Sequence, residues 1–195
     1  MSAPEHRAGL PILAFPDQPA FEAWLAAQPA DSPGLWLKLA KQGSAAASLT
    51  KSEAIDAALC YGWIDGQLHP YDPDWWLVRF TPRKARSKWS QKNRDRAEQL
   101  IAAGRMCARG LAEVEAARAD GRWAAAYASA STAEVPPDLQ AALDANPAAA
   151  AFFATLTGAN RYAVLYRIGA VKRAETRTRK IAEFVAMLER HETLH

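Results

Sequence analysis

The alternation of apolar and polar residues predicts a small sheet in the first half of the chain. Residues 12–15 suit a short strand, and residues 35–40 place a leucine at every second position. Two longer runs, 63–71 and 75–83, flank the turn-forming triplet Asp72-Pro73-Asp74. A period of two with turn residues between the runs is typical of antiparallel strands. We therefore expect a small, mainly antiparallel sheet.

Helical spacing and capping residues predict helices that pack with this sheet. Asp17 can cap a helix that ends near residue 28. Thr50 and Glu53 have the spacing of a capping box, which predicts a helix over residues 50–59. Two further helices are expected before residue 121, one capped by Ser87 or Ser90 and running to Gly104, and one over about 109–120.

The second half of the chain has only helical patterns. Residues 128–137 have the composition of a linker, and Asn146-Pro147 is a helix cap followed by proline at the first helical position. The fold class expected is α+β, with a small, mainly antiparallel sheet packed with helices and followed by an all-helical C-terminal segment. The expected division is an α+β core over 1–127, the linker, and a helical segment over 138–195.

Composition and charge narrow the class of protein. A chain of 195 residues suits one domain or one domain with a small appendage. The net charge of +3 does not favour nucleic acid as a partner. Basic residues are uneven, however, with eight against one acid from Arg79 to Arg96 and six against one from Arg167 to Lys180. Such runs become anion sites only where the fold gathers them.

Cysteine, histidine and apolar-run patterns bear on location and cofactors. Cys60 and Cys107 are too few for a disulfide framework and fit a reducing compartment. No signal-peptide pattern and no apolar run of about 20 residues occurs, so a cytoplasmic protein without a transmembrane segment is expected. Neither a P-loop nor a GxGxxG motif occurs, and no cofactor or metal is expected. The histidines are scattered, at His6, His69, His191 and His195.

The register of the predicted hairpin decides which side chains share a face. If residues 72–74 form the loop, Tyr71 pairs with Trp75 and Asp65 pairs with Thr81. One face then carries Leu68, Trp76, Val78 and Phe80, with Gly66 leaving room for Phe80. The opposite, non-core face carries Trp63, Asp65, Gln67, His69, Arg79 and Thr81.

This non-core face predicts either a binding site or an ordinary solvated surface. Trp63 and Trp75 are large aromatic residues on a side that does not face the core, and Trp36 and Lys38 lie on the non-core face of another strand. Aromatic walls with a few polar groups are typical of small-molecule pockets. The alternative is an exposed sheet with a cross-strand ion pair.

The helix at residues 50–59 offers a second set of reactive groups. Its 3.6-residue period brings Glu53, Asp56 and Cys60 to one side. Glu53 or Asp65 is a candidate general base, and Arg79 a candidate stabiliser of charge. Cys60 is a candidate nucleophile that needs a base, for which His69 is the only neighbour in sequence. The simpler interpretation is an acidic first helical turn and a small buried thiol.

The segment RFTPRKARSKWSQKN at 79–93 predicts an anion-binding loop before a helix. Cations at Arg83, Lys84, Arg86 and Lys88 precede the potential capping residues Ser87, Ser90 and Asn93. Free backbone N–H groups at a helix start favour anions. The alternative is a capped helix with a basic surface, in which Trp89 is a hydrophobic staple.

Several strings in this chain together resemble one family. They are ALCYGWIDG at 58–66, RFTPRKARSKWSQKN at 79–93, GRM at 104–106, GRWAAAY at 121–127 and AVKRAETRTRKI at 170–181. In this order they resemble the YdeI/OmpD-associated, or bacteriocin-protection, family across nearly the whole chain. Val171 replaces an alanine of the family pattern. The resemblance implies bacterial tolerance of bacteriocins, cationic antimicrobial peptides or envelope stress, and implies no particular reaction or cofactor.

Three hypotheses follow from the sequence. The first is a cytoplasmic stress-protection protein whose cleft binds an anionic or aromatic small molecule or a peptide. The second is an enzyme that uses the same cleft, and the third is a module that binds nucleic acid or an anionic surface. The expected ligand-binding residues are Trp63, Asp65, Arg79, Thr81, Arg83, Ser87, Trp89, Ser90, Asn93, Asp56 and Arg177.

Overall fold

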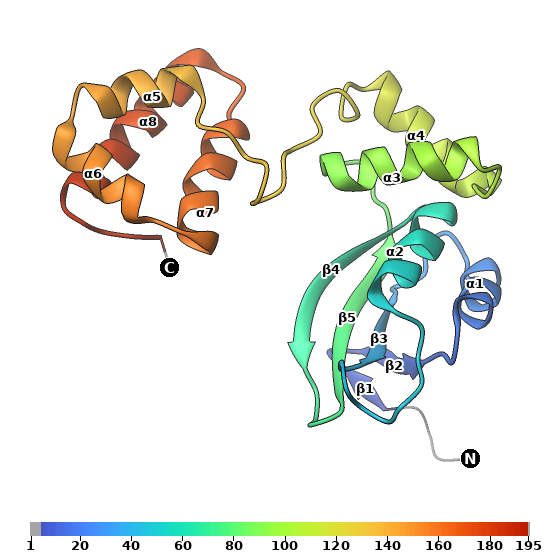
Figure 1. Cartoon of the computed structure of the whole chain (residues 1–195). Helices are drawn as coiled ribbons and strands as arrows, with labels where there is room; N and C mark the ends of the chain where they lie inside the picture. Colours follow the sequence, from blue (N-terminus) through green and yellow to red (C-terminus); the bar gives the residue numbers. More distant parts are fainter. Residues whose placement is uncertain (1–4, 195) are drawn as a thin grey trace. The chain divides into compact units, whose positions relative to one another are not determined.

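The chain folds as two compact units (Figure 1). Taken together, its helices and strands give the expected α+β class. The computed structural model describes residues 5–194, so His195 lies outside it. Unit 1 comprises the residues up to Trp89 together with Asn93–Ala125. Unit 2 comprises Ser90–Lys92 and the residues from Ala126 onward, so the segment 128–137 expected as a linker is grouped with unit 2.

Unit 1 contains a mixed, mainly antiparallel sheet. Among the described residues its five strands are β1 (His6–Arg7), β2 (Leu10–Ala14), β3 (Leu35–Ala40), β4 (Trp63–Pro70) and β5 (Trp75–Pro82). Their spatial order is β1-β2-β3-β5-β4, which leaves β4 at an edge. Only the β2–β3 pair within this sheet is parallel, because the helix after β2 returns the chain in the same direction.

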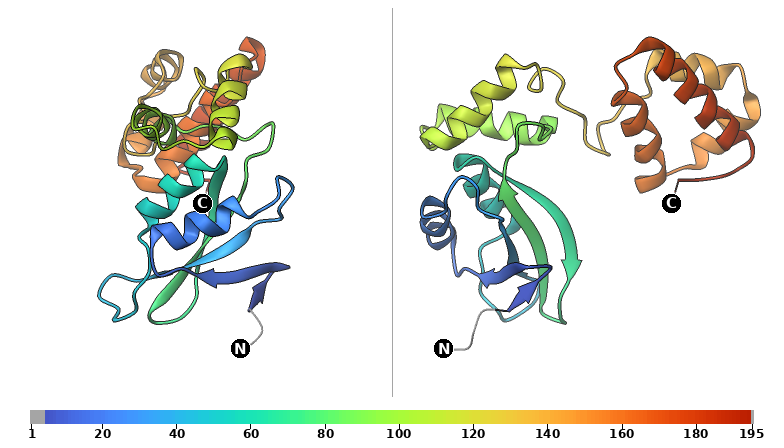
Figure 2. Two further views of the ribbon diagram at one scale, coloured as in Figure 1. Left: turned by 90° about the vertical axis from the view of Figure 1, so that its right-hand side faces the viewer. Right: turned by 180° about the vertical axis from the view of Figure 1, so that it is seen from behind.

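Two capped helices cover one face of this sheet (Figure 2). Helix α1 (Gln18–Ala26) begins where the Asp17 side chain accepts a hydrogen bond from the Ala20 backbone at 2.9 Å. Helix α2 (Lys51–Cys60) begins with the predicted capping box, in which the side chains of Thr50 and Glu53 bond each other's backbone N–H groups. Unit 1 is completed by α3 (Gln91–Ala102) and α4 (Ala108–Ala119), apart from the first residues of α3.

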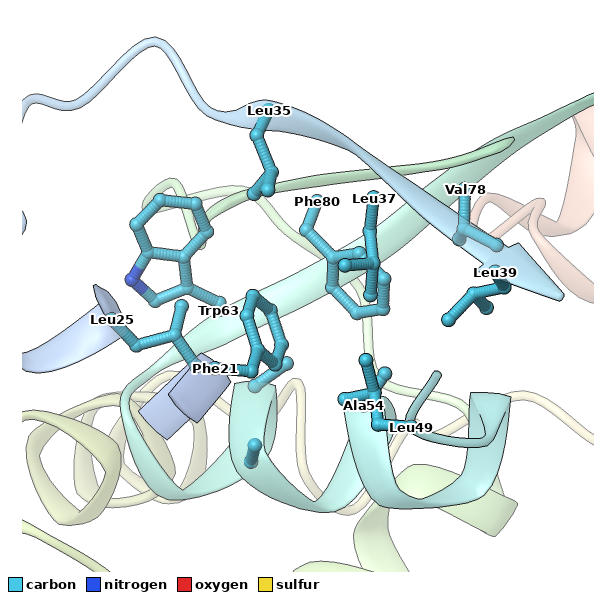
Figure 3. Close-up of a cluster of buried hydrophobic side chains, with 12 residues drawn as sticks. Phe21, Leu25, Leu35, Leu37, Leu39, Leu49, Ala54, Trp63, Val78 and Phe80 are labelled. Carbon is cyan, nitrogen blue, oxygen red and sulfur yellow. The ribbon is translucent and has the colours of Figure 1, made fainter. Parts of the chain in front are cut away.

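The core of unit 1 lies between the sheet and these two helices (Figure 3). The leucines of β3 pack against Val78 and Phe80 of β5 and against Phe21 of α1. Each such side chain stabilises the fold by about 1.5–3 kcal/mol when fully buried. The core residues labelled in Figure 3 are Phe21, Leu25, Leu35, Leu37, Leu39, Leu49, Ala54, Trp63, Val78 and Phe80.

A β-bulge in β4 divides the hairpin into two registers. Near the turn, Leu68 pairs with Val78 and His69 with Leu77, as the sequence predicted. The register then shifts between Asp65 and Leu68, so that Asp65 pairs with Phe80 instead of Thr81. One extra residue in a strand reverses the side to which every residue beyond it points.

The shift overturns the predicted assignment of faces. Trp63 belongs to the core and is only 1% exposed, not part of an open polar face. Leu68 keeps its predicted pairing with Val78 but is 55% exposed. Gly66 does not make room for the Phe80 ring, because a Cβ added at Gly66 would meet only the Arg79 carbonyl oxygen, at 3.7 Å.

The start of α4 packs against the end of α2. The Cys60 carbonyl accepts hydrogen bonds from the Cys107 backbone N–H at 3.2 Å and from the Cys107 Sγ at 2.8 Å. A carbonyl at a helix C-terminus and donors at a helix N-terminus satisfy each other's free groups. The contact needs glycine at position 110, where an added Cβ would lie 2.3 Å from the Cys60 carbonyl oxygen.

Unit 2 is a helical unit with its own core. Its helices are α5 (Pro137–Asp144), α6 (Pro147–Thr155), α7 (Gly158–Gly169) and α8 (Ala174–Glu189). The start of α6 is the predicted Asn146 cap, whose side chain accepts a hydrogen bond from the Ala149 backbone at 3.1 Å. The residues that form its buried core are Leu139, Leu143, Ala149, Phe153, Leu156, Val164, Leu165, Ile168, Ile181, Phe184 and Leu188.

An ion pair joins α5 to α8 inside unit 2. The Arg177 guanidinium donates to both carboxylate oxygens of Asp138, at 2.5 and 2.8 Å, and to the Ile168 carbonyl at 2.8 Å. The hydrogen bonds from Arg177 lower the pKa of Asp138 below its usual value of 3.8. The charged form of Asp138 is therefore the one that stabilises unit 2.

Replacing Gly110 by alanine should destabilise unit 1 by about 2 kcal/mol, because the new methyl group overlaps the backbone of α2. The expected readout is a lower midpoint of denaturant unfolding followed by tryptophan fluorescence, since all seven tryptophans lie in unit 1. Gly66→Ala is the matched control, and we expect a change below about 0.5 kcal/mol there because the added Cβ makes only an ordinary contact. Equal losses in both variants would contradict the proposed α2–α4 packing.

Replacing Asp138 by asparagine should lower the stability of unit 2 at pH 7 and have little effect at pH 3. A carboxyl with a lowered folded pKa stabilises the fold above its unfolded pKa, and this contribution is lost as the pH falls through the folded pKa. The loss at pH 7 should be at most about 1 kcal/mol, because the Asp138 side chain is 46% exposed. Circular dichroism at the two pH values, under denaturant, measures it.

Asp144→Asn is the control for this pH dependence. Asp144 ends the same helix and accepts a hydrogen bond from the neutral Gln140 side chain at 2.8 Å, so we expect no comparable loss at pH 7. A stability loss in the Asp138 variant that stays the same at both pH values would show that the ion pair is not its source.

Candidate functional site

The structure places Asp65 and Arg79 on opposite faces of the sheet. Asp65 is paired with Phe80, so it faces α2, where its carboxylate lies 4.0 Å from Lys51 Nζ. Arg79 is paired with Trp36 on the other face. The expected cleft, which required Trp63, Asp65 and Arg79 to emerge together, is not formed. Asp65 therefore has no arginine beside it to act with as an acid–base pair.

The outer face of the sheet is largely filled by the chain's own groups. Leu10, Trp36 and Leu77 form a second buried cluster there, and the Trp36 indole donates to the Arg7 carbonyl at 3.1 Å. Lys38 Nζ lies 4.2 Å from the Tyr71 ring centroid and 4.9 Å from that of Trp75. The aromatic walls predicted for a ligand thus hold a lysine of the same chain.

Arg79 and Thr81 are the predicted site residues that stay on this outer face. Arg79 is half-buried, and its Nε is buried without a hydrogen-bond partner. Thr81 is half-buried and pairs with Ile64. Since Trp63 and Asp65 face the other way, these two residues are left without the acidic and aromatic partners that the predicted site needed.

The acids of α2 are engaged in structural contacts. Asp56 is 7% exposed, and both of its carboxylate oxygens accept from the Arg96 guanidinium, at 2.7 and 2.5 Å. The Glu53 carboxylate accepts from the Thr50 backbone N–H at 2.7 Å, which lowers the pKa of Glu53. The lowered pKa makes Glu53 a weak base, and the Asp56 carboxylate is already paired with Arg96, so neither acid is placed for general base catalysis.

Cys60 lacks the environment of a nucleophile. Burial raises the pKa of the Cys60 thiol to about 11, so the thiol is protonated at neutral pH. His69, the only candidate base, has its Nδ1 within 2.5 Å of the Pro70 carbonyl instead. Because the thiolate is the reactive form, this arrangement does not support a Cys–His enzyme.

The predicted anion loop is held by aromatic packing in unit 1. The Arg83 guanidinium stacks on Trp89 at 3.5 Å from the ring centroid, and Trp89 packs edge-on against Trp123 at 4.8 Å. Trp89 is 1% exposed, so its ring is not open to a ligand. Ser87 belongs to this loop, where its hydroxyl accepts from the Lys84 backbone N–H at 2.9 Å.

The remaining predicted residues, Ser90, Asn93 and Arg177, do not add to one site. Ser90 forms a β-bridge with Tyr127 in unit 2, and the Gln91 backbone N–H donates to the Tyr127 carbonyl at 2.9 Å. This N–H at the start of α3 is therefore not available to an anion. Asn93 lies in the first turn of α3, and Arg177 is the partner of Asp138 in unit 2.

The described part of the chain contains a groove in unit 2 that the sequence did not predict. It has a volume of about 510 Å³ and lies between α8 on one side and α5 with the α5–α6 turn on the other. Its walls are small or aliphatic side chains with polar residues at the two ends. The lining residues are Asp138, Ala142, Ala145, Asn146, Thr178, Ile181, Ala182, Val185, Ala186 and Glu189.

The charges at the two ends of the groove differ. Asp138, at one end, is neutralised by Arg177. Glu189, at the other end, is exposed and is the last residue of α8, where the helix carbonyl groups add partial negative charge. The negative charge at this end of the groove therefore comes from Glu189 and the end of α8, next to the cation of Arg190.

The sequence carried one signal for this groove. Along α8, the positions 178, 181, 182, 185, 186 and 189 follow a spacing of three and four residues, and two of them, 182 and 186, are alanine. The buried stripe of the same helix contains Ile181, Phe184 and Leu188. The two alanines beside the core stripe indicate a face that another helix can approach closely.

No helix in residues 5–194 is both long enough and apolar enough to cross a membrane. Within the same range, no three His, Cys, Asp or Glu side chains gather as a potential metal site.

Comparison with known families gives two separate matches. Residues 13–113, just over half of the chain, match a family described as Domain of unknown function (DUF8412). Residues 132–191 match the family described as Bacteriocin-protection, YdeI or OmpD-Associated. Comparisons with curated proteins and with solved structures gave no significant match.

The second match confirms the family suspected from the sequence, but only for the C-terminal part. The strings at 58–66 and 79–93, which were attributed to the same family, fall in the stretch that DUF8412 matches. The string at 170–181 falls within the bacteriocin-protection match, and so does every residue that lines the groove. The chain belongs to the DUF8412 family, and residues 132–191 of its unit 2 match the YdeI/OmpD-associated, bacteriocin-protection family.

Proposed function

We propose that unit 2 binds an amphipathic helical peptide in the groove between α5 and α8, and that this binding underlies a bacteriocin-protection-type role. The observation that carries the proposal is the groove between α5 and α8, with Ala142, Ala182 and Ala186 in its walls, inside the segment that matches the bacteriocin-protection family. We further propose that the protein acts in the cytoplasm, as its cysteine usage suggests.

The dimensions of the groove suit a helix. From Thr178 to Glu189 the stripe extends over about 16 Å at 1.5 Å per residue, or about three helical turns. Ala142, Ala182 and Ala186 leave room for a neighbouring backbone, and close helix packing has an interaxial distance of about 8–10 Å. The groove is therefore matched to a short peptide helix that presents one apolar face.

The chemistry of the groove favours a cationic occupant. Its apolar walls contribute burial, while Glu189 and the C-terminal carbonyl groups of α8 attract a basic residue at one end. Asp138 contributes little charge because Arg177 neutralises it. A peptide that combines an apolar face with lysine or arginine can contact the apolar walls and also place a positive charge near Glu189. An anionic or aromatic small molecule has no positive charge to place there.

The enzyme hypothesis has less support in the geometry. It required Asp65 beside Arg79 or an activated Cys60, and Asp65 instead lies near Lys51 while the Cys60 thiol has a raised pKa. Peptide binding requires only shape, apolar surface and charge, which the groove combines.

A groove-filling substitution tests this proposal. The probe is a fluorescein-labelled peptide of leucine, alanine and lysine, about 14 residues long, patterned as an amphipathic helix. Fluorescence anisotropy should show saturable binding to the full chain. Ala182→Trp should weaken binding at least about tenfold, because the indole occupies the groove, and Glu189→Gln should weaken it about threefold.

The matched control is Ala141→Trp, an exposed alanine on α5 outside the groove. It should bind the probe as the unaltered chain does, and a scrambled peptide of the same composition should bind more weakly to both. Equal affinities for the Ala182 and Ala141 variants would contradict groove binding. In cells challenged with such a peptide, the Ala182 variant should protect less than the Ala141 variant.

A further inference from the structure

The loop between β5 and α3 carries a group of positively charged residues in unit 1. No acidic residue occurs between Asp74 and Asp95. Within the loop, Lys84, Arg86 and Lys88 are all exposed. Among the described residues neither Lys84 nor Arg86 forms an ion pair, so their charges are open to an anion.

The backbone that carries these cations is fixed from within the loop. The Ser87 N–H donates to the Lys84 carbonyl at 2.8 Å, and the Lys84 N–H donates to the Ser87 hydroxyl at 2.9 Å. The Arg122 guanidinium donates to the Ser87 carbonyl at 3.0 Å. These three hydrogen bonds close a tight turn, which is seen as a green arc between β5 and α3 in Figure 2.

Both ends of the turn are anchored in buried structure. At the start, the Arg83 backbone N–H donates to the Gly62 carbonyl at 2.9 Å. At the end, Trp89 is buried against Trp123, and the Arg83 guanidinium that stacks on Trp89 also donates to the Lys88 carbonyl at 3.3 Å. A loop held in this way loses little conformational entropy when a ligand binds.

We propose that this loop binds a small ligand that carries two or more phosphate groups. Three cations at alternate positions over five residues span at most about 13–14 Å of chain, which matches a compact polyanion. Single-stranded nucleic acid needs exposed rings on which bases stack, and Trp89, the loop's only aromatic residue, is buried. The loop has no exposed large apolar residue with which to enter a lipid surface. This site lies in unit 1 and is independent of the peptide groove.

Inorganic triphosphate is the probe for the test. Isothermal titration calorimetry at low salt should detect saturable binding to the full chain, and the affinity should fall steeply as salt is added. The triple variant Lys84→Ala, Arg86→Ala, Lys88→Ala should weaken binding at least about tenfold, as expected for the loss of the contacting charges. Ser87→Ala, which keeps every charge but removes one hydrogen bond of the turn, should weaken it about threefold.

The matched control removes the same net charge from unit 2. Arg167, Lys172 and Arg173 are also exposed, and their triple alanine variant should bind triphosphate within about twofold of the unaltered chain. Equal losses in the two triple variants, or no binding to the unaltered chain, would overturn the proposal. Loop-dependent binding of a DNA duplex or of anionic vesicles without binding of triphosphate would overturn it as well. Unchanged tryptophan fluorescence verifies that the loop variants are folded, because Trp89 and Trp123 pack beside the loop, and unchanged circular dichroism verifies it for the helical unit 2 variant.

Discussion

The burial of Trp63 determines the register of the β4–β5 hairpin, and the chemistry of both sheet faces follows from that register. An indole that is removed from water and packs edge-on against Trp24 at 5.5 Å contributes about 3 kcal/mol or more. A regular hairpin would turn this ring to the other face. The bulge costs little by comparison, because Gly66 and Gln67 are exposed on an edge strand where water can satisfy the backbone.

The same constraint explains why polar residues of one hairpin do not form one site. Beyond the bulge, Asp65 turns with Trp63 toward α2 and meets Lys51, while Arg79 in the unbulged strand keeps its side. The outer face is then completed by short-range partners, with Lys38 between Tyr71 and Trp75. Aromatic and polar residues that could line a pocket form a closed surface here, because the side chains of the same face fill the space between them.

Local signals in the sequence predicted the helices and strands well. They predicted poorly which face of the sheet a side chain takes beyond the β-bulge. Caps at Asp17, Thr50 and Asn146 depend on residues within one helical turn, so the sequence alone identifies them. The bulge depends on a tertiary preference, the burial of Trp63, which no local pattern contains. A proline-containing turn specifies where a hairpin begins, but it does not exclude an extra residue several positions away.

The groove illustrates a different difficulty in predicting structure from sequence. The alanines of α8 were a visible signal for it, but such a signal can be interpreted in two ways. Small residues on a helix reduce the apolar area that the helix buries. They also reduce the distance at which another helix can pack. In α8 the larger side chains, Phe184 and Leu188, form the buried stripe, and the neighbouring stripe with Ala182 and Ala186 stays accessible. Alanine along a second stripe thus has a different role from alanine in a core: it keeps a surface shallow, apolar and open to a partner backbone.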